Sequence, residues 1–467
     1  MGSWFLLVTL IALGFLLLRA IWPSSRGWSG TDPLRLAAAP AFGLGIGSCL
    51  YFVFRIVLQL PVLAVDIAVI AALVCTGAAA WSRADATVDI GPNHRPAPLW
   101  LWGLLGAGAL MALLTFLMLH AAAPHGEWDA WSIWNLRARF LFRAQEFGSP
   151  FSALIDWAHP DYPLLVPGAI ALLWHAGGRE STAIAGVVNL LFLLSAVTVP
   201  FFALRLLRGP SLAALGALSI LAATAMVRVS ASLYADVPLA AFFVIAGCFL
   251  VYGLEVETAG PGPILAAGFA AGLAAWTKNE GLLFCVSLGA AHFLAIKGVA
   301  EIGRRVRTVI PLAAGILVVL AVAGHFKFRM APPNDLVNAS NKGLFGARIV
   351  DFGRYWATFW AFVGEFLTFG NVLVPPVIVF SAWLALVRVR ATLTGAALLP
   401  LVAVTLQLAG YFLVYVTAPN DLDWQLTTSL PRLLLHVWPL AVTGIFLISR
   451  DIFDGDPQPS GAAARSK

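Results

Sequence analysis

The chain has 467 residues, of which 60% are hydrophobic and only 11% are charged, with a formal net charge of +6 at pH 7. Soluble domains carry roughly 25% charged residues, so this composition excludes an ordinary soluble protein. Many stretches of about 17–22 residues lack a charge, which is enough helix to cross roughly 30 Å of hydrocarbon. The composition therefore predicts an all-α polytopic membrane protein. Its basic residues are dispersed, which is typical of membrane-protein loops and argues against a nucleic-acid partner.

The first apolar stretch, residues 4–18, is expected to be a retained helix, because no basic segment precedes it and no small-residue cleavage site follows it. The four cysteines all lie in apolar segments and form no CxxC pair. This pattern favours neither a disulfide framework nor a thiolate metal site.

About thirteen membrane spans are expected from the length of the apolar runs. They lie near residues 4–22, 36–57, 60–80, 98–120, 183–204, 211–228, 237–253, 263–277, 280–296, 308–326, 372–390, 396–416 and 432–449. Two more apolar segments, 162–175 and 352–369, are expected to touch the membrane without crossing it. The first is short for a span, and the second contains Arg354 and Glu365.

Basic residues of short loops mark the cytoplasmic side of a membrane protein. Here they follow the first, third, fifth, ninth and eleventh predicted spans, which places the N-terminus outside and the C-terminus inside. Residues 450–467 then form a polar cytoplasmic tail, which is predicted to be disordered. The basic residues concerned are Arg26, Arg35, Arg83, Arg95, Arg205, Arg208, Lys297, Arg304, Arg305, Arg307, Arg388 and Arg390.

The loop 326–350 is basic although this topology places it outside, where positive charge is usually depleted. Its cations are Lys327, Arg329, Lys342 and Arg348. A basic loop on this side suggests an anionic ligand.

Asp129 lies just beyond the fourth predicted span, between Trp128 and Trp131, with no neighbouring cation in the sequence. A carboxylate beside an apolar wall is a candidate general base. A helix-capping aspartate is the alternative, because residues 131–145 follow with the apolar spacing of an amphipathic helix. The arginines of that segment are typical of a helix lying in the headgroup layer. They are Arg137, Arg139 and Arg143.

Further charged residues stand where predicted helices begin or break on the same outer face. Asp236 starts a span and is followed by Pro238, so it is either a functional acid or an N-cap. Lys278 and Glu280 lie in a short break between two apolar segments. Either the two side chains pair with each other, or the break places the Lys278 ammonium beside a phosphate. Arg432 begins the last span, and an arginine reaching out to the membrane interface is the alternative interpretation there.

His159 and Asp161, in the sequence His-Pro-Asp-Tyr-Pro-Leu, are the two candidate ligands for a divalent metal. Two ligands make an incomplete set, so a metal site is the less favoured interpretation of these residues. No GxGxxG or Walker motif is present, which argues against nucleotide-driven chemistry.

These segments resemble the GT-C superfamily, the integral-membrane glycosyltransferases that use polyprenyl-linked sugars. The resemblance is to the branch that holds protein O-mannosyltransferases and the aminoarabinose transferase. The family has an acidic outer loop, an amphipathic juxtamembrane helix and a Pro-Leu motif, which Asp129, residues 131–145 and residues 159–164 match. It has a second acid in a Tyr-x-Asp-x-Pro-Leu setting, matched by residues 234–239, and a Thr-Lys-x-x-Gly motif, matched by residues 277–281. Residues 419–432 are also similar to bacterial members.

The resemblance covers residues 98–449, which would form the catalytic domain, with 1–97 as additional N-terminal transmembrane helices. The chain departs from the family in two ways. The acidic loop follows the fourth predicted span instead of the first, because three additional spans come before it, and Ala130 stands where an Asp-Glu pair has its second carboxylate. These departures leave the subfamily and any metal use open.

The resemblance implies transfer of a sugar from a polyprenyl phosphate, with inversion, at the outer face of a bacterial inner membrane. The acceptor would be a glycan, lipid or protein of the cell envelope. Asp129 and Asp236 would be the catalytic acids, and the lipid phosphate would meet the cations Lys278, Arg432, Lys327 and Arg329. His159, Asp161 and Glu280 are candidates for acceptor or metal binding. A membrane transporter and a lipid-linked glycan polymerase or ligase are the alternatives.

Overall fold

The computed structural model describes residues 2–23, 28–83, 94–144, 147, 151–296, 302–334, 339–371, 375–390 and 392–451. Most of the predicted tail, as well as Arg26 and Lys297, falls outside these ranges. The described residues form helices and no strand, and they contain one isolated β-bridge between Val389 and Ser449. The predicted fold class, an all-α polytopic membrane protein, is thus confirmed.

Nine helices of the described chain are long and apolar enough to cross a membrane. A tenth span results if α8 (Pro210–Ala222) and α9 (Thr224–Ala231), which meet at an angle of 59°, are counted together. The nine are α1 (Gly2–Ile21), α2 (Asp32–Tyr51, extended by a π-helical turn to Val57), α3 (Val62–Ser82), α4 (Leu99–Ala122), α7 (Thr182–Arg208), α10 (Asp236–Glu255), α13 (Ile302–Arg329), α17 (Gly395–Thr417) and α18 (Leu422–Ile448).

Three of the thirteen predicted spans are shorter helices in the structure. They are α11 (Gly262–Thr277), α12 (Glu280–Ala295) and α16 (Pro376–Val387). The two segments expected not to cross form α6 (Leu165–Gly177) and α15 (Phe352–Thr368), with 13 and 17 residues. A spanning helix usually has roughly 17–25 residues, so α6 is too short to cross the hydrocarbon alone and α15 is at the lower limit.

Helix α10 lies at the centre of the bundle, and every residue from Asp236 to Tyr252 is buried. It packs against α7, α11, α17 and α18. Its neighbour α11 lies close to α13, because glycines face backbone on both helices. A Cβ atom at Gly268 would come within 2.1 Å of the Leu312 carbonyl oxygen, and one at Gly315 within 2.3 Å of the Leu265 carbonyl oxygen. This close packing fixes the end of α11, where Lys278 follows.

The 20 residues of α10 separate two polar ends of the bundle by about 30 Å. At the Glu255 end, the Arg208 guanidinium donates two hydrogen bonds of 2.7 Å to the Glu255 carboxylate, and its Nε donates to the Leu447 carbonyl. The Arg390 amide donates to the Ile448 carbonyl at this same end. Basic residues that were predicted to be cytoplasmic therefore gather at one end of the bundle.

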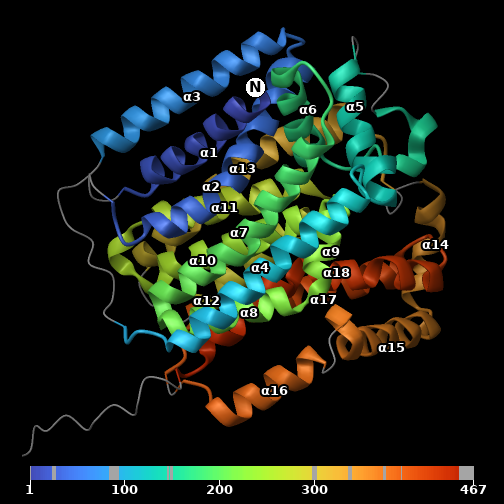
Figure 1. The fold of residues 1–467 in the computed structure, drawn as a ribbon. Helices are drawn as coiled ribbons and strands as arrows, with labels where there is room; N and C mark the ends of the chain where they lie inside the picture. The colour runs from blue at the N-terminus through green and yellow to red at the C-terminus, as the bar shows by residue number, and fades with distance from the viewer. Residues whose placement is uncertain are drawn as a thin grey trace, which may run out of the picture.

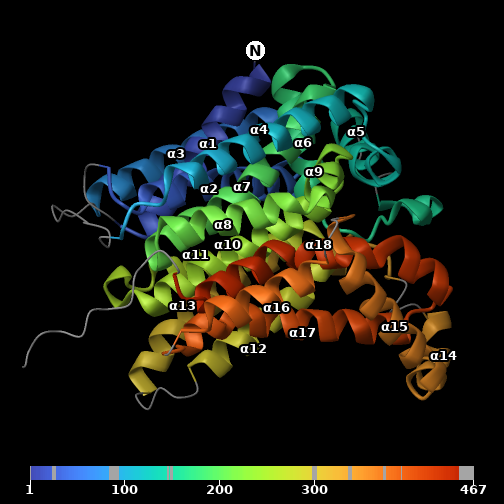
Figure 2. The same ribbon diagram turned by 60° about the horizontal axis from the view of Figure 1, so that its bottom comes forward.

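The residues predicted to lie outside gather at the opposite end, around Asp236. Helices α5 (Asn135–Arg143) and α14 (Ala339–Ile349) also lie toward one end of the bundle, at the right of both views, although they are separated from each other there (Figures 1 and 2). Arg348 of α14 donates to the Pro419 carbonyl in the turn before α18. The distribution of basic residues predicts that the Glu255 end faces the cytoplasm and that the Asp236 end faces outward.

Candidate functional site

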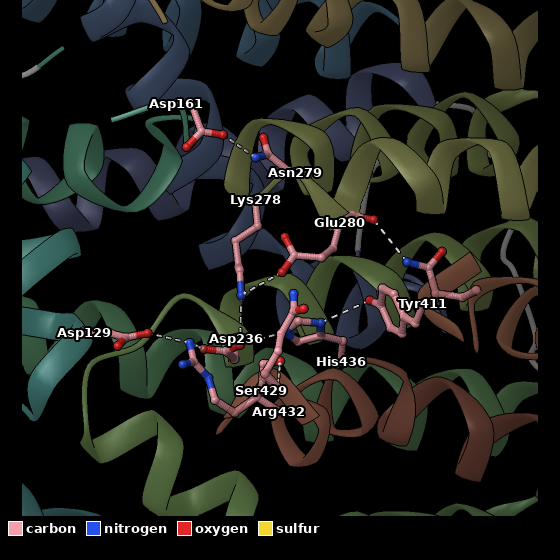
Figure 3. A network of polar contacts seen from close by, with 12 residues as sticks. Asp129, Asp161, Asp236, Lys278, Asn279, Glu280, Tyr411, Ser429, Arg432 and His436 are labelled. Atoms are coloured by element: carbon pink, nitrogen blue, oxygen red, sulfur yellow. Dashed lines mark hydrogen bonds and ion pairs between the residues drawn. The ribbon is translucent and has the colours of Figure 1, made fainter. Parts of the chain in front are cut away.

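Asp236 is the centre of a buried polar network that joins three parts of the chain (Figure 3). Its carboxylate is fully buried, and Oδ1 accepts hydrogen bonds from Lys278 Nζ at 3.0 Å and His436 Nε2 at 2.7 Å. Its Oδ2 accepts a hydrogen bond from Arg432 Nη2 at 2.9 Å. Asp236 makes no capping hydrogen bond, since Ala235 is the N-cap of α10. The capping interpretation of Asp236 is therefore wrong, and the carboxylate instead binds cations.

Asp129 joins this network through Arg432, whose Nη2 lies 2.7 Å from Asp129 Oδ2. The sequence shows no cation near Asp129, but the fold supplies one from the last helix. Asp129 makes no capping hydrogen bond to the π-helical turn Ala130–Trp134 that follows it, so the capping alternative is wrong here too. The loop before it is fixed by a hydrogen bond from the Glu127 amide to the Ser232 carbonyl. Gly126 has φ = 75° there, and a Cβ atom would meet that same carbonyl at 2.4 Å.

Lys278 binds both acidic residues that flank it in space. Its Nζ lies 3.1 Å from Glu280 Oε1 as well as 3.0 Å from Asp236, and its side chain is only 4% exposed. The tight break that positions it depends on Gly281, where a Cβ atom would come within 2.1 Å of the Ala274 carbonyl oxygen. Lys278 therefore does more than pair with Glu280, because it also binds Oδ1 of Asp236, whereas Arg432 binds Oδ2.

Several buried polar atoms around this network have no hydrogen-bond partner among the described residues. They include the acceptors Glu280 Oε2, Asn279 Oδ1 and Gln425 Oε1 and the donor Arg432 Nε. Buried polar groups are nearly always paired in folded proteins, and exceptions concentrate where a ligand or water completes them. The three unpaired acceptors would suit hydroxyl groups of a ligand, and the unpaired Arg432 Nε would suit an anionic group.

Asp161 forms a second cluster next to the first. Its Oδ2 accepts hydrogen bonds from the side-chain amides of Asn279 at 2.7 Å and Asn334 at 2.8 Å, and Lys327 Nζ lies 3.5 Å away. Lys327 also donates to the Asp161 carbonyl oxygen. The structure thus places Lys327 beside Asp161, whereas Arg329 is exposed and has no hydrogen bond or ion pair among the described residues.

Arg137 of α5 binds the backbone on both sides of Asp161. Its side chain is fully buried and donates to the carbonyls of Tyr162 and Pro160, so it faces the protein interior instead of the lipid headgroups. Arg139 and Arg143 remain closer to the surface and pair with Glu180 at 3.2 and 2.5 Å. Partial burial raises the pKa of the Glu180 carboxyl, but the hydrogen bonds from Arg143 and Arg139 outweigh it and lower the pKa overall.

His159 and Asp161 do not make a metal site. The His159 ring stacks on Tyr162 with centroids 5.0 Å apart, and its backbone is left-handed at φ = 48°. The Asp161 carboxylate faces two amide groups and an ammonium, whose donors would oppose a cation. Across the described residues, no three His, Cys, Asp or Glu side chains gather in a way that holds a metal ion.

Two tyrosines line the network outside the spanning helices. Burial raises the pKa of Tyr234 to about 12, and the charge of Asp129 adds to this shift. Burial also raises the pKa of Tyr162, with the charges of Glu280 and Asp161 adding to it. Arg432 lies 4.8 Å from the Tyr234 ring centroid, and Lys278 lies 5.8 Å from that of Tyr162. Both phenols therefore stay protonated at neutral pH, and the Tyr234 ring lies against Arg432 while the Tyr162 ring lies against Lys278.

The residues that complete the network from α17 and α18 were not predicted from the sequence. His436 lies between Asp236 and Tyr411, whose Oη is 3.1 Å from His436 Nδ1. One helical turn away, Tyr415 and Ser429 form a hydrogen bond of 2.8 Å. The available signal was helical spacing, since Ser429, Arg432 and His436 lie on one face of α18.

No family model, no curated protein and no solved structure matches the chain. The resemblance to GT-C glycosyltransferases therefore depends on the sequence motifs alone.

Proposed function

We propose that the chain is an inverting glycosyltransferase of the bacterial inner membrane, which uses a polyprenyl-phosphate-linked sugar at the outer face. One observation carries the proposal: a single nitrogen of Arg432 joins Asp129 and Asp236 at 2.7 and 2.9 Å. A candidate base and a cation for a phosphate thus share one site, although they come from segments far apart in the sequence. Such a pair would accelerate glycosyl transfer from a lipid phosphate, because a base takes the proton of the acceptor and a cation stabilises the departing phosphate.

In the proposed reaction, Asp129 takes the proton of an acceptor hydroxyl as its oxygen attacks the anomeric carbon. The bond from that carbon to the phosphate oxygen breaks, and polyprenyl phosphate leaves with its electron pair. Arg432 is the cation best placed to meet the growing negative charge, because its side chain is 24% exposed and that of Asp129 is 17% exposed. Lys278 is almost enclosed, so it supports Arg432 through Asp236.

The other proposed phosphate ligands, Lys327 and Arg329, lie at the end of α13. Lys327 already binds Asp161, whose partner Asn279 directly precedes Glu280. We therefore assign Lys327 to the wall of the donor site and Arg329 to its exposed rim.

An apolar cavity supports a lipid-linked donor. Its volume is about 500 Å³, it lies between α15 and α17, and its lining includes Phe359, Phe362, Phe412 and Leu413. The Phe362 ring contacts Tyr415, which hydrogen-bonds Ser429 one turn before Arg432. A polyprenyl chain lying along these rings would bring its phosphate toward Arg432.

A transporter is the main alternative, since buried charges also mark transport pathways. Transport sites usually lie near the bilayer midplane at broken helices. Here the network lies at the first residue of α10, at one end of the bundle. This position favours transfer at a membrane face.

The test compares cell-envelope glycans by mass analysis in cells with the protein, without it, and with the Asp129→Asn variant. Purified protein in lipid nanodiscs is then given polyprenyl-phosphate sugars and, separately, diphosphate-linked oligosaccharides. Loss of one glycan modification without the protein, with transfer from the monophosphate donors, is the expected result. Unchanged glycans together with no transfer would overturn the proposal, and transfer only from the diphosphate donors would favour a polymerase or ligase.

A further inference from the structure

We propose that His436, supported by Tyr411, is a positioning residue that fixes the Asp236 carboxylate and, through Arg432, the Asp129 carboxylate. The expected effect on kcat rests on the proposed function. The effect on the position of Asp129 can be tested without any transfer assay. His436 is fully buried within α18 and does not reach the exposed part of the site. It therefore acts on the reaction only through its neighbours.

The hydrogen bonds determine which nitrogen of His436 carries a proton. An ionised carboxylate only accepts, so the 2.7 Å contact with Asp236 requires a hydrogen on His436 Nε2. In the neutral ring, Nδ1 is then an acceptor, and the Tyr411 hydroxyl at 3.1 Å donates to it. Tyr411 thus selects the tautomer that His436 needs to hold Asp236, as a second group does for many functional histidines.

Asp236 has three donors arranged around its two oxygens. His436 and Lys278 hold Oδ1, which leaves Oδ2 directed toward Arg432. Without His436, Oδ1 keeps only the flexible ammonium of Lys278, and the carboxylate gains freedom to rotate. Arg432 Nη2 bridges Asp236 and Asp129, so a displaced Asp236 displaces the partner of Asp129 as well.

Three substitutions test the chain of contacts. His436→Gln supplies a side-chain amide that can replace the Nε2 donor, and His436→Phe removes that donor. The His292→Phe variant is the matched control, because His292 is also buried in an apolar helix but its ring nitrogens have no hydrogen-bond partner among the described residues. His436→Phe is expected to lower kcat by about 10-fold or more with little change in KM, since a hydrogen bond to a charged group is lost. His436→Gln should retain most of the activity, and His292→Phe should match the wild type.

A second measurement follows Asp129 directly in the purified full-length protein. A water-soluble carbodiimide with an amine labels accessible carboxylates, and peptide mass analysis gives the labelling rate at Asp129. The rate should rise severalfold in His436→Phe and stay near the wild-type rate in His436→Gln and His292→Phe. Tyr411→Phe removes one hydroxyl and should raise labelling by a smaller factor, which keeps the test valid if His436→Phe does not fold.

Equal labelling of Asp129 in the wild type and in both the His436→Phe and Tyr411→Phe variants would overturn the proposal. So would a loss of activity in His436→Gln as large as that in His436→Phe. If the wild-type protein transfers no sugar, the proposed function fails, and the labelling rates still decide whether His436 positions Asp129.

Discussion

Arg432 and Asp129 form an ion pair of 2.7 Å, although Asp129 follows the fourth helix and Arg432 lies in the last one (Figure 3). The same guanidinium nitrogen reaches Asp236, so the outer loop, α10 and α18 share one fixed point. Ion pairs at exposed surfaces contribute little to the stability of the fold, but this one borders a buried network. A change at any of the three residues should therefore affect the other two.

The first prediction concerns the proposed base. Asp129→Asn should lower the transfer rate by about 10²–10⁴-fold, because the amide cannot accept the proton from the acceptor hydroxyl. The variant should still insert and fold, since asparagine is nearly the same size. Transfer from a radiolabelled polyprenyl-phosphate sugar in nanodiscs measures the effect.

Glu127→Gln provides the matched control, because Glu127 is an exposed acid in the same loop. It should keep the wild-type rate. A rate for Asp129→Asn that equals the rate for Glu127→Gln would remove Asp129 from the mechanism.

The second prediction concerns Lys278. Lys278→Met should reduce activity by about 10-fold or more, because hydrogen bonds to charged groups contribute about 1.5–3 kcal/mol. Lys278→Arg should be milder, since the positive charge is kept. The double change Lys278→Met with Glu280→Gln should not restore activity, because Asp236 still lacks its 3.0 Å partner. Full recovery in the double variant would mean that Lys278 serves only to neutralise Glu280.

The sequence alone identified the residues whose charge is unusual for their surroundings. Asp129, Asp236, Lys278 and Arg432 stand out because each interrupts or borders an apolar run. Charge parity across the predicted spans also placed them on one face, and the structure brings them into one network. Their chemical roles remain predictions.

The partners of these residues could not be predicted because they depend on helix packing. Single polar residues such as His436 and Tyr411 look like ordinary core positions in an apolar helix until two helices are aligned. Arg137 is buried where it donates to the carbonyls of Pro160 and Tyr162, and the spacing of apolar residues in the sequence cannot predict this contact. The described residues contain nine or ten helices that are long enough to span a membrane, against about thirteen predicted spans, partly because an apolar run does not show whether its helix is broken. The predicted span 211–228, for example, bends at Ala223.

The third prediction concerns stability. Asp236→Asn should lower the unfolding temperature clearly, because breaking a buried ion pair on one side costs about 3–5 kcal/mol. Arg143→Gln, which breaks the pair of Glu180 with an arginine that is 67% exposed, should change it little, since exposed pairs contribute about 0–1 kcal/mol. Thermal unfolding of both variants in the same detergent, followed by tryptophan fluorescence, makes the comparison. Equal unfolding temperatures would show that the network around Asp236 does not stabilise the fold.

The fourth prediction concerns which end of the bundle faces outward. Leu344 is exposed in α14, which contacts the turn before α18 at the end that carries the network. Ser82 is exposed at the end of α3, next to Arg83, whose guanidinium binds the Ala20 carbonyl at the opposite end. In a variant whose four native cysteines are replaced, Leu344→Cys should react with an impermeant maleimide in intact spheroplasts. Ser82→Cys should react only after lysis, because the loops rich in arginine are expected to be cytoplasmic. The reverse pattern would place the network on the cytoplasmic face and would exclude transfer at the outer surface.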